Sequence, residues 1–87
     1  MKNLEEISEI ITKLKSKEEV CSFLLELLTD SEVIDISKRW RILKMLSCGS
    51  TQREISSELK VSLCKVTRGA KIIKDKNAII TKYLKGV

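Results

Sequence analysis

Residues 51–69 read TQREISSELKVSLCKVTRG, and the interpretation of the whole chain depends on this stretch. Thr51 and Glu54 have the spacing of a capping box, which predicts that a short helix begins here. Ser62 is suited to cap a second helix, which is expected to run from residue 63 to about residue 74. Two short helices joined by a three-residue break form either a helix-turn-helix or an ordinary helical hairpin.

The apolar residues of this stretch fill the positions that a helix-turn-helix buries. Ile55 and Leu59 would face inward from the first helix, which is expected to end at Leu59. Val61 would fill the turn, and Val66 would anchor the second helix. Lys60 stands at the turn position usually held by Gly, where a left-handed backbone costs a non-glycine residue about 1 kcal/mol. The spacing tolerates that cost and predicts a helix-turn-helix.

The outward face of the second helix and the charge distribution favour a nucleic-acid partner. Small, hydrogen-bonding and cationic side chains suit base edges and phosphates, and a plain helical hairpin does not require them. Residues 51–87 hold nine Lys/Arg against three Asp/Glu, a net charge of +6, whereas residues 1–50 hold eight against nine, a net charge of −1. The basic excess coincides with the candidate reading head. The alternative is a solvated lysine-rich surface.

The composition predicts one all-α domain. Hydrophobic residues make up 43% of the 87 residues but aromatic residues only 3%, and there is no Pro. We divide residues 1–87 into a dimerisation core at 1–49, a helix-turn-helix reading head at 51–74 and a C-terminal helix at 76–87. Apolar periodicity and capping residues predict six helices in all.

Four of these helices lie outside the reading head. Gly49 is placed to end the longest of them. Its apolar residues Val33, Ile36, Trp40 and Leu43 form one stripe. Because the apolar faces of the first three helices exceed what one small chain can cover, we expect a dimer. The expected elements are about 3–14, a helix after a capping box at Ser16, about 30–47, and a short helix from Asp75 or Asn77 to near Lys85, with Gly86 beyond it.

Several classes of protein and site are not expected. Cys21, Cys48 and Cys64 form an odd set without a CxxC motif, and the chain has no His, which argues against a disulfide framework and a zinc site. No apolar run reaches membrane-spanning length, and the Glu-rich start does not resemble a signal peptide. We therefore expect a cytoplasmic protein with reduced thiols, no metal and no membrane partner. An enzyme is not expected, since no carboxylate–nucleophile constellation is present.

Over about residues 24–74 the chain resembles the tryptophan repressor family. The resemblance rests on an LLT helix end, the R-x-R-I pattern of RWRI, a Gly, and the motifs QREI and VTRG at this spacing. It implies an intertwined, all-helical homodimer with two reading heads. It also implies L-tryptophan as the corepressor ligand, no other cofactor, and double-stranded operator DNA as the partner.

Carried onto matching positions, the resemblance implies a tryptophan site. Arg39 and Arg68 would sandwich the indole ring, Arg68 and Thr29 would bind the carboxylate, and Gly69 would leave room for the ring. A guanidinium is planar and permanently charged, so it stacks on aromatic rings and pairs with carboxylates in a bidentate manner. Taken singly, the two arginines are better explained as surface ion-pair partners, and it is the motif around them that favours the ligand site.

Other parts of the implied site are less usual. The ligand's ammonium would meet backbone carbonyls near Glu26 and Leu28, at the end of the partner chain's second helix. Ile72 stands where the family often offers a serine hydroxyl to the amino group, so recognition of the ammonium would rest on carbonyls alone. Outside this site, Lys65 stands where a smaller polar residue is usual, a departure that concerns the operator sequence. The expected tryptophan-binding residues are Glu26, Leu28, Thr29, Arg39, Arg68, Gly69 and Ile72.

The resemblance also implies which side chains would meet DNA. Arg53 would contact a guanine or a phosphate, and Leu63 would either touch a thymine methyl group or help to anchor its helix in the core. Cys64 lies on the same face, where its thiol either senses oxidants or is incidental. A DNA-binding regulator that does not need tryptophan and a basic dimeric protein-interaction module remain the alternatives. The expected DNA-binding residues are Gln52, Arg53, Ser56, Leu63, Cys64, Lys65, Thr67, Lys71 and Lys74.

Overall fold

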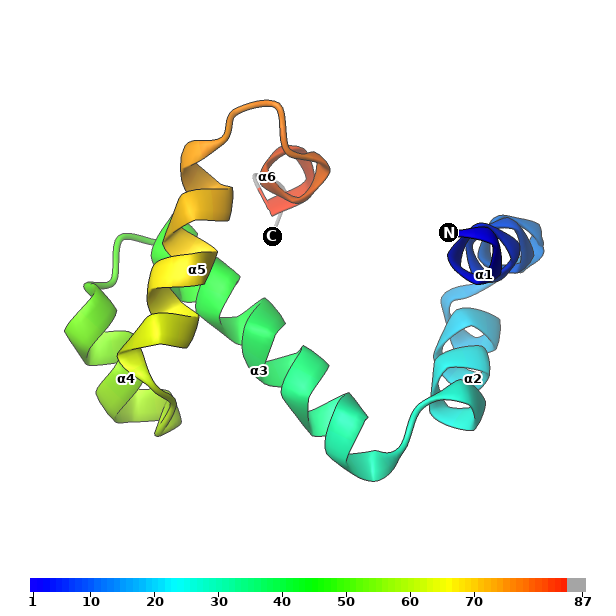
Figure 1. Ribbon diagram of the computed structural model, residues 1–87, viewed down its shortest axis with the longest axis horizontal. Coiled ribbons are helices and arrows are strands. Elements are labelled where there is room, and N and C mark those ends of the chain that lie inside the picture. Colours follow the sequence, from blue (N-terminus) through cyan, green and yellow to red (C-terminus); the bar gives the residue numbers. More distant parts are fainter. Residues whose placement is uncertain (85–87) are drawn as a thin grey trace. The chain divides into compact units, whose positions relative to one another are not determined.

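The computed structural model describes residues 1–84, and this part of the chain is helical without strands (Figure 1). The all-α prediction with six helices is confirmed for these residues. The chain divides into two compact units, Met1–Val33 and Ile34–Val87, which we call unit 1 and unit 2 and describe separately. The helices are α1 (Lys2–Lys13), α2 (Lys17–Leu27), α3 (Asp30–Ser47), α4 (Gln52–Leu59), α5 (Leu63–Lys74) and α6 (Ile79–Leu84).

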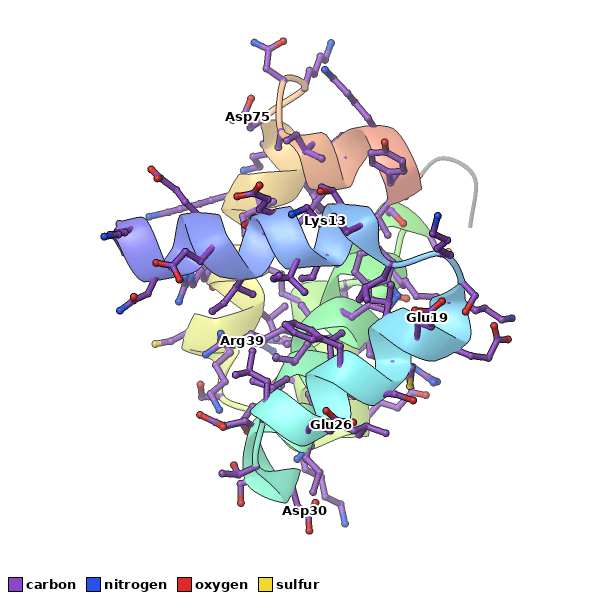
Figure 2. The ribbon with its side chains drawn as sticks, turned by 90° about the vertical axis from the view of Figure 1, so that its right-hand side faces the viewer. Lys13, Glu19, Glu26, Asp30, Arg39 and Asp75 are labelled. Atoms are coloured by element: carbon purple, nitrogen blue, oxygen red, sulfur yellow. The ribbon has the colours of Figure 1, made fainter. Side chains whose placement is uncertain are left out.

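Unit 1 contains α1, α2 and the first turn of α3. The Ser16 hydroxyl accepts a hydrogen bond from the Glu19 amide at 3.1 Å, so the predicted cap of α2 is confirmed. Figure 2 shows side chains of both helices, with Lys13 labelled on α1 and Glu26 on α2. Neither helix has a buried residue. Of these two helices only α2 has a side-chain cap, and the apolar side chains of both remain exposed or half-buried.

The start of α3 is held by a reciprocal pair of hydrogen bonds. The Thr29 hydroxyl accepts from the Glu32 amide at 3.2 Å, and a Glu32 carboxylate oxygen accepts from the Thr29 amide at 2.9 Å. Such a capping box satisfies two backbone donors that a helix start leaves without partners. The chain thus enters α3 at the residue that the sequence predicts.

Unit 2 contains the hydrophobic core. Ile42 of α3, Ile55 of α4 and Val66 of α5 are almost completely buried, at 2%, 0% and 0% exposure. Since each comes from a different helix, the end of α3 and the two helices of the reading head share one core. Partly buried side chains surround these three, namely Met45, Leu46, Leu59 and Val61.

The C-terminus of α3 confirms the predicted role of Gly49. Its φ is +93°, a left-handed backbone that glycine adopts without a Cβ clash. The Ser50 amide donates to the Met45 carbonyl at 3.0 Å, and the Gly49 amide donates to the Leu46 carbonyl at 3.1 Å. These two bonds form a Schellman motif, which ends the helix and satisfies carbonyls of its last turn.

The expected start of the last helix is wrong by a few residues. The Asp75 amide still bonds back to the Ile72 carbonyl, and the Asp75 side chain accepts from the Asn77 amide at 2.9 Å. Because that carboxylate closes a turn, it does not cap a helix, and α6 begins only at Ile79. The expected end near Lys85, with Gly86 beyond it, lies outside the described residues.

Candidate reading head and ligand pocket

The first helix of the reading head is capped as the sequence predicts. The Thr51 hydroxyl accepts from the Glu54 amide at 3.1 Å, and a Glu54 carboxylate oxygen accepts from the Thr51 amide at 3.0 Å. The backbone amide of Thr51 is the main reason that the pKa of Glu54 lies below its ordinary value, and the Thr51 hydroxyl lowers this pKa further. The Thr51 amide and the Thr51 hydroxyl therefore both favour the ionised form of the Glu54 carboxylate.

The turn between α4 and α5 is held by hydrogen bonds at Val61. Lys60 has φ 54° and ψ 47°, which confirms the left-handed conformation expected at this position. The Val61 amide donates to the Ser56 carbonyl at 3.2 Å, and the Ser56 hydroxyl donates to the Val61 carbonyl at 2.6 Å. These bonds help to offset the cost of the strained lysine, and they give the Ser56 hydroxyl a partner within the turn.

The second helix begins with a cap and buries one face. The Ser62 hydroxyl accepts from the Lys65 amide at 3.4 Å, while Val66 and Ala70 lie in the buried part of the helix. Leu63 is 48% exposed. The prediction that Leu63 anchors its helix in the core is therefore wrong. Its side chain is accessible, as the alternative of a contact with DNA requires.

A hydrogen-bonded contact joins the start of α4 to the second turn of α5. The Thr67 hydroxyl lies 3.0 Å from the Gln52 side-chain oxygen and 3.0 Å from the Leu63 carbonyl. Gln52 and Ser56 are partly buried, and the other seven expected DNA-binding side chains are exposed. All nine lie on α4 and α5. The exposed ones are Arg53, Leu63, Cys64, Lys65, Thr67, Lys71 and Lys74.

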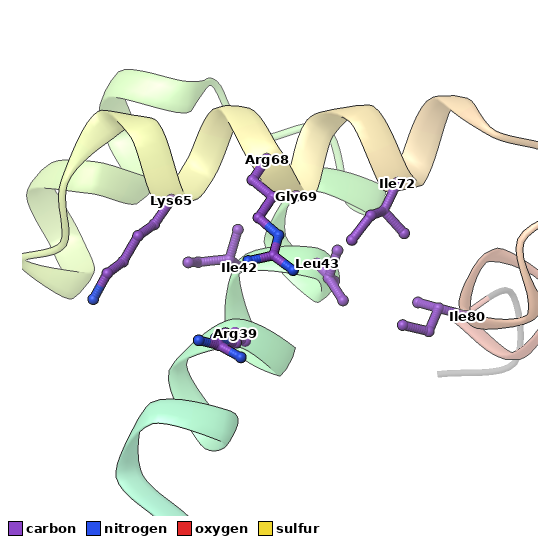
Figure 3. Close-up of a pocket in the computed structure, with 8 residues that line it drawn as sticks. All are labelled: Arg39, Ile42, Leu43, Lys65, Arg68, Gly69, Ile72 and Ile80. Carbon is purple, nitrogen blue, oxygen red and sulfur yellow. The ribbon is translucent and has the colours of Figure 1, made fainter. Parts of the chain in front are cut away.

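A pocket of about 270 Å³ lies in unit 2 between α3, α5 and α6 (Figure 3). Arg39 lines it from α3, and Arg68 lines it from α5. Figure 3 shows both guanidinium groups at the pocket, each reaching it from its own helix. The volume is near the lower limit of typical ligand pockets, about 300 Å³. The lining residues are Arg39, Ile42, Leu43, Lys65, Arg68, Gly69, Ile72 and Ile80.

The sequence identified half of these lining residues, and helix geometry explains most of the others. Ile42 and Leu43 lie three and four residues after Arg39, so they share its side of α3. Lys65 lies one turn before Arg68 on α5, a relation that the sequence contained but that we assigned only to DNA. No sequence signal indicates Ile80, because its position depends on how α6 packs.

Gly69 is needed for packing as well as for the pocket. A Cβ at this position would lie 3.0 Å from Ile42 Cγ2, 3.3 Å from Leu46 Cδ1 and 3.5 Å from Leu43 Cδ2. The missing side chain therefore lets α5 approach α3 closely, and it brings the helices that carry Arg68 and Arg39 together.

The remaining expected ligand residues belong to unit 1. Thr29 is exposed, and its hydroxyl oxygen accepts the Glu32 amide, which leaves the hydroxyl proton available to another acceptor. The Leu28 amide bonds to the Leu24 carbonyl, so the Glu26 carbonyl belongs to the last turn of α2, where helical partners are lacking.

Three further features of the described residues complete this account. Within residues 1–84 no group of His, Cys, Asp and Glu side chains is arranged to hold a metal ion. No helix in the same residues is long and apolar enough to cross a membrane. Cys21, Cys48 and Cys64 are free and exposed.

Comparisons with known proteins indicate the family of this chain. Proteins named Trp operon repressor homolog from Xylella fastidiosa strains M23, Temecula1 and 9a5c are each 38% identical to this chain over 74 residues. The match covers 84% of this chain and 80% of each relative. No solved structure matches significantly. The sequence model of the family described as Trp repressor protein matches residues 2–86. This chain therefore belongs to the Trp repressor family, whose members are DNA-binding regulators and not enzymes.

Proposed function

We propose that this protein is a tryptophan-dependent transcriptional repressor that acts in the cytoplasm. It binds double-stranded operator DNA as an intertwined homodimer and controls genes of tryptophan biosynthesis or uptake. The main supporting observation is the pocket between Arg39 and Arg68, because one of its walls, α5, is also the second helix of the reading head.

The exposed face of the reading head suits a DNA groove. Arg53 contacts a guanine edge or a phosphate, and Leu63 and Cys64 meet thymine methyl groups. Lys71 and Lys74 follow on the same helix and supply positive charge for the phosphate backbone. Lys65 and Thr67 are exposed on this face as well, and Gln52 and Ser56 lie partly buried beside it. The contact between Gln52 and Thr67 links α4 to α5.

The pocket suits a flat aromatic carboxylate. Ile42, Leu43 and Ile72 provide an apolar lining, and the guanidinium groups of Arg39 and Arg68 provide cationic planes on which an indole stacks. Arg68 also pairs with the ligand carboxylate. An indole is aromatic and planar, so it matches both the lining and the cations.

Binding of the ligand is coupled to DNA through the shared helix. A ligand held between Arg39 on α3 and Arg68 on α5 favours the head orientation in which the two recognition helices of the dimer lie about one duplex turn apart, roughly 34 Å. The ligand's effect on DNA affinity is limited to its difference in affinity for the two head orientations.

The exposed apolar residues support the dimer. Leu4 and Leu25 of unit 1 are 53% and 57% exposed, and Ile36 and Trp40 of α3 are also exposed. Exposed apolar side chains in such number are typical of surfaces that a partner covers, and a second copy is the partner that symmetry favours. In that dimer the second chain completes the site with its Thr29 hydroxyl and the carbonyls near Glu26 and Leu28.

Calorimetric titration with L-tryptophan tests this proposal. We expect saturable binding of one ligand per chain, loss of that binding in Arg68→Ala, and tighter binding of duplex DNA when tryptophan is present. Lys71→Ala is the matched control for the ligand step, because it removes a cation from the same helix outside the pocket.

The possible outcomes separate the alternatives. DNA binding of equal strength with and without tryptophan identifies a ligand-independent regulator. Absence of salt-dependent duplex binding identifies the protein-interaction module, because phosphate contacts make the affinity fall steeply with salt.

A further inference from the structure

The contact between Gln52 and Thr67 orients a side chain of the reading head. The Thr67 hydroxyl donates to the Gln52 side-chain oxygen at 3.0 Å, across the packed pair of helices α4 and α5 (Figure 1). Within residues 1–84 no other hydrogen bond or ion pair joins the side chains of two different helices. The amide group of Gln52 is therefore held by α5 and does not rotate freely at the start of α4.

The position of the Thr67 hydroxyl is set by its own helix. Its oxygen also lies 3.0 Å from the Leu63 carbonyl, one turn earlier in α5. A threonine in a helix commonly bonds the carbonyl of the preceding turn, and this bond fixes its side-chain rotamer. The Leu63 carbonyl and the Gln52 oxygen share the hydroxyl proton. Thr67 is thus a fixed donor toward which the Gln52 oxygen turns.

An engaged oxygen leaves Gln52 with its two N–H donors. A glutamine amide consists of one oxygen acceptor and one NH₂ group. When it reads adenine, it accepts from N6 and donates to N7, which requires both halves of the amide. The oxygen of Gln52 is turned toward α5, so the NH₂ group is the half that remains for DNA. Guanine O6 and N7 and the phosphate oxygens are acceptors that suit such a donor.

We propose that Thr67 is a positioning residue that fixes the Gln52 amide as a hydrogen-bond donor to DNA and prevents it from reading adenine. The inference rests on the proposed function, because it assumes that the reading head binds duplex DNA. The partner of Gln52 is an acceptor group of the duplex, either a guanine edge or a phosphate oxygen. In both cases Thr67 acts through Gln52.

Selection from a pool of random-sequence duplexes tests the orientation of the amide. The full-length protein, Thr67→Val and Thr67→Ser each select duplexes in the presence of L-tryptophan. Valine keeps the shape of threonine without the hydroxyl, and serine keeps the hydroxyl. Thr81→Val is the matched control, because the Thr81 hydroxyl bonds the carbonyls of Ile72 and Asp75, outside the contact between α4 and α5. Thermal unfolding establishes that the variants are folded.

The expected change in base preference depends on the partner of Gln52. Gln52→Ala identifies the position that Gln52 reads, because the preference there is lost. If the partner is a guanine, Thr67→Val shifts this position from guanine toward adenine, whereas Thr67→Ser and Thr81→Val retain guanine. If the partner is a phosphate, no position changes, and an uncharged methylphosphonate at one backbone position abolishes the difference in affinity between the unmodified protein and Thr67→Val.

A double-mutant cycle tests whether Thr67 acts through Gln52. Thr67→Val should weaken binding of the selected duplex about fivefold, which corresponds to one net hydrogen bond of about 1 kcal/mol. In the Gln52→Ala background the same substitution should change the affinity by less than about twofold, because the side chain that it positions is absent. Thr67→Ser should bind like the unmodified protein.

The contrary results are distinct from one another. An equal loss from Thr67→Val with and without Gln52 overturns the inference, because Thr67 then contacts DNA by itself. A preference of the unmodified protein for adenine at the position that Gln52 reads also overturns it, because the amide oxygen is then free. Failure of the unmodified protein to enrich any duplex, with or without tryptophan, overturns the proposed function instead.

Discussion

The helices α2 and α4 begin with the same kind of cap but differ in how far their side chains are buried. Each starts with a hydroxyl group that accepts the amide of a Glu three residues later, Ser16 in α2 and Thr51 in α4. Yet α2 has no buried residue, whereas α4 buries Ile55 completely. A cap acts within one turn and starts a helix anywhere, but burial requires side chains from other helices. In the reading head these side chains come from helices of the same chain, whereas in unit 1 the chain provides no helix that buries a residue of α2.

The largest effect should come from the core of the reading head. Ile55→Ala removes a side chain that α3, α4 and α5 bury together, and we expect it to lower the free energy of unfolding by about 2–5 kcal/mol. Urea denaturation followed by circular dichroism measures this loss. The control is Leu25→Ala at a concentration where the protein is monomeric, which should change the free energy by less than about 0.5 kcal/mol. Equal losses would remove the distinction between the two regions.

The next effect concerns association rather than folding. Leu25→Asp places a charge on the exposed apolar face of α2, and desolvating that charge in a dimer interface should weaken dimerisation at least about tenfold. Sedimentation equilibrium of the unmodified protein and of Leu25→Asp measures the change in the dimer dissociation constant. Glu26→Gln is a suitable control, because it alters the neighbouring side chain without adding a buried charge. An unchanged dimer would show that a partner chain does not cover this face.

A smaller effect is expected where α5 meets α3. Gly69→Ala gains up to about 1 kcal/mol of helix propensity, but its Cβ would press on Ile42, a buried and β-branched side chain that yields little. Because overpacking typically costs about 1–3 kcal/mol, we expect a net loss of about 1 kcal/mol in stability and weaker ligand binding. Thermal unfolding measures the stability, and calorimetric titration measures the ligand binding. A more stable variant would mean that α5 shifts away from α3 without penalty.

The smallest effect should be the pH dependence of the α4 cap. Folding lowers the pKa of Glu54, so its stabilising contribution is present above the ordinary value of about 4.5 and is lost as the pH falls through the lower value of the folded protein. Glu54→Gln keeps an oxygen that accepts the Thr51 amide but cannot titrate. Denaturant unfolding at several pH values should therefore show a weaker loss of stability below pH 4.5 in this variant. Glu58→Gln, outside the capping box, should retain the loss.

Local features of the chain were predictable because they depend on neighbours in sequence. The caps at Ser16, Thr51 and Ser62 and the helix end at Gly49 involve bonds over a few residues, and all four are present. The predicted start of α6 was wrong for a local reason as well. The Asp75 side chain can either cap a helix or close a turn, and in the structure it closes a turn by accepting the Asn77 amide.

The stripe on α3 shows where such reasoning stops. Periodicity places Ile36, Trp40 and Leu43 on one face, yet only Leu43 is buried. Whether a residue of an apolar stripe is covered depends on which helices pack against it, and at Gly69 α5 packs against Ile42, Leu43 and Leu46 of α3. The exposed part of the stripe leaves room for a second copy.

By itself, the sequence determined most of the helices, the helix-turn-helix and the basic charge of residues 51–87, because these follow from periodicity, capping and composition. The resemblance to the tryptophan repressor family indicated the pair Arg39 and Arg68. Only the tertiary structure decided that Lys65 and Ile80 border the same pocket as those arginines. Contacts between side chains on separate helices depend on how closely the helices approach, and here Gly69 sets the approach of α5 to α3.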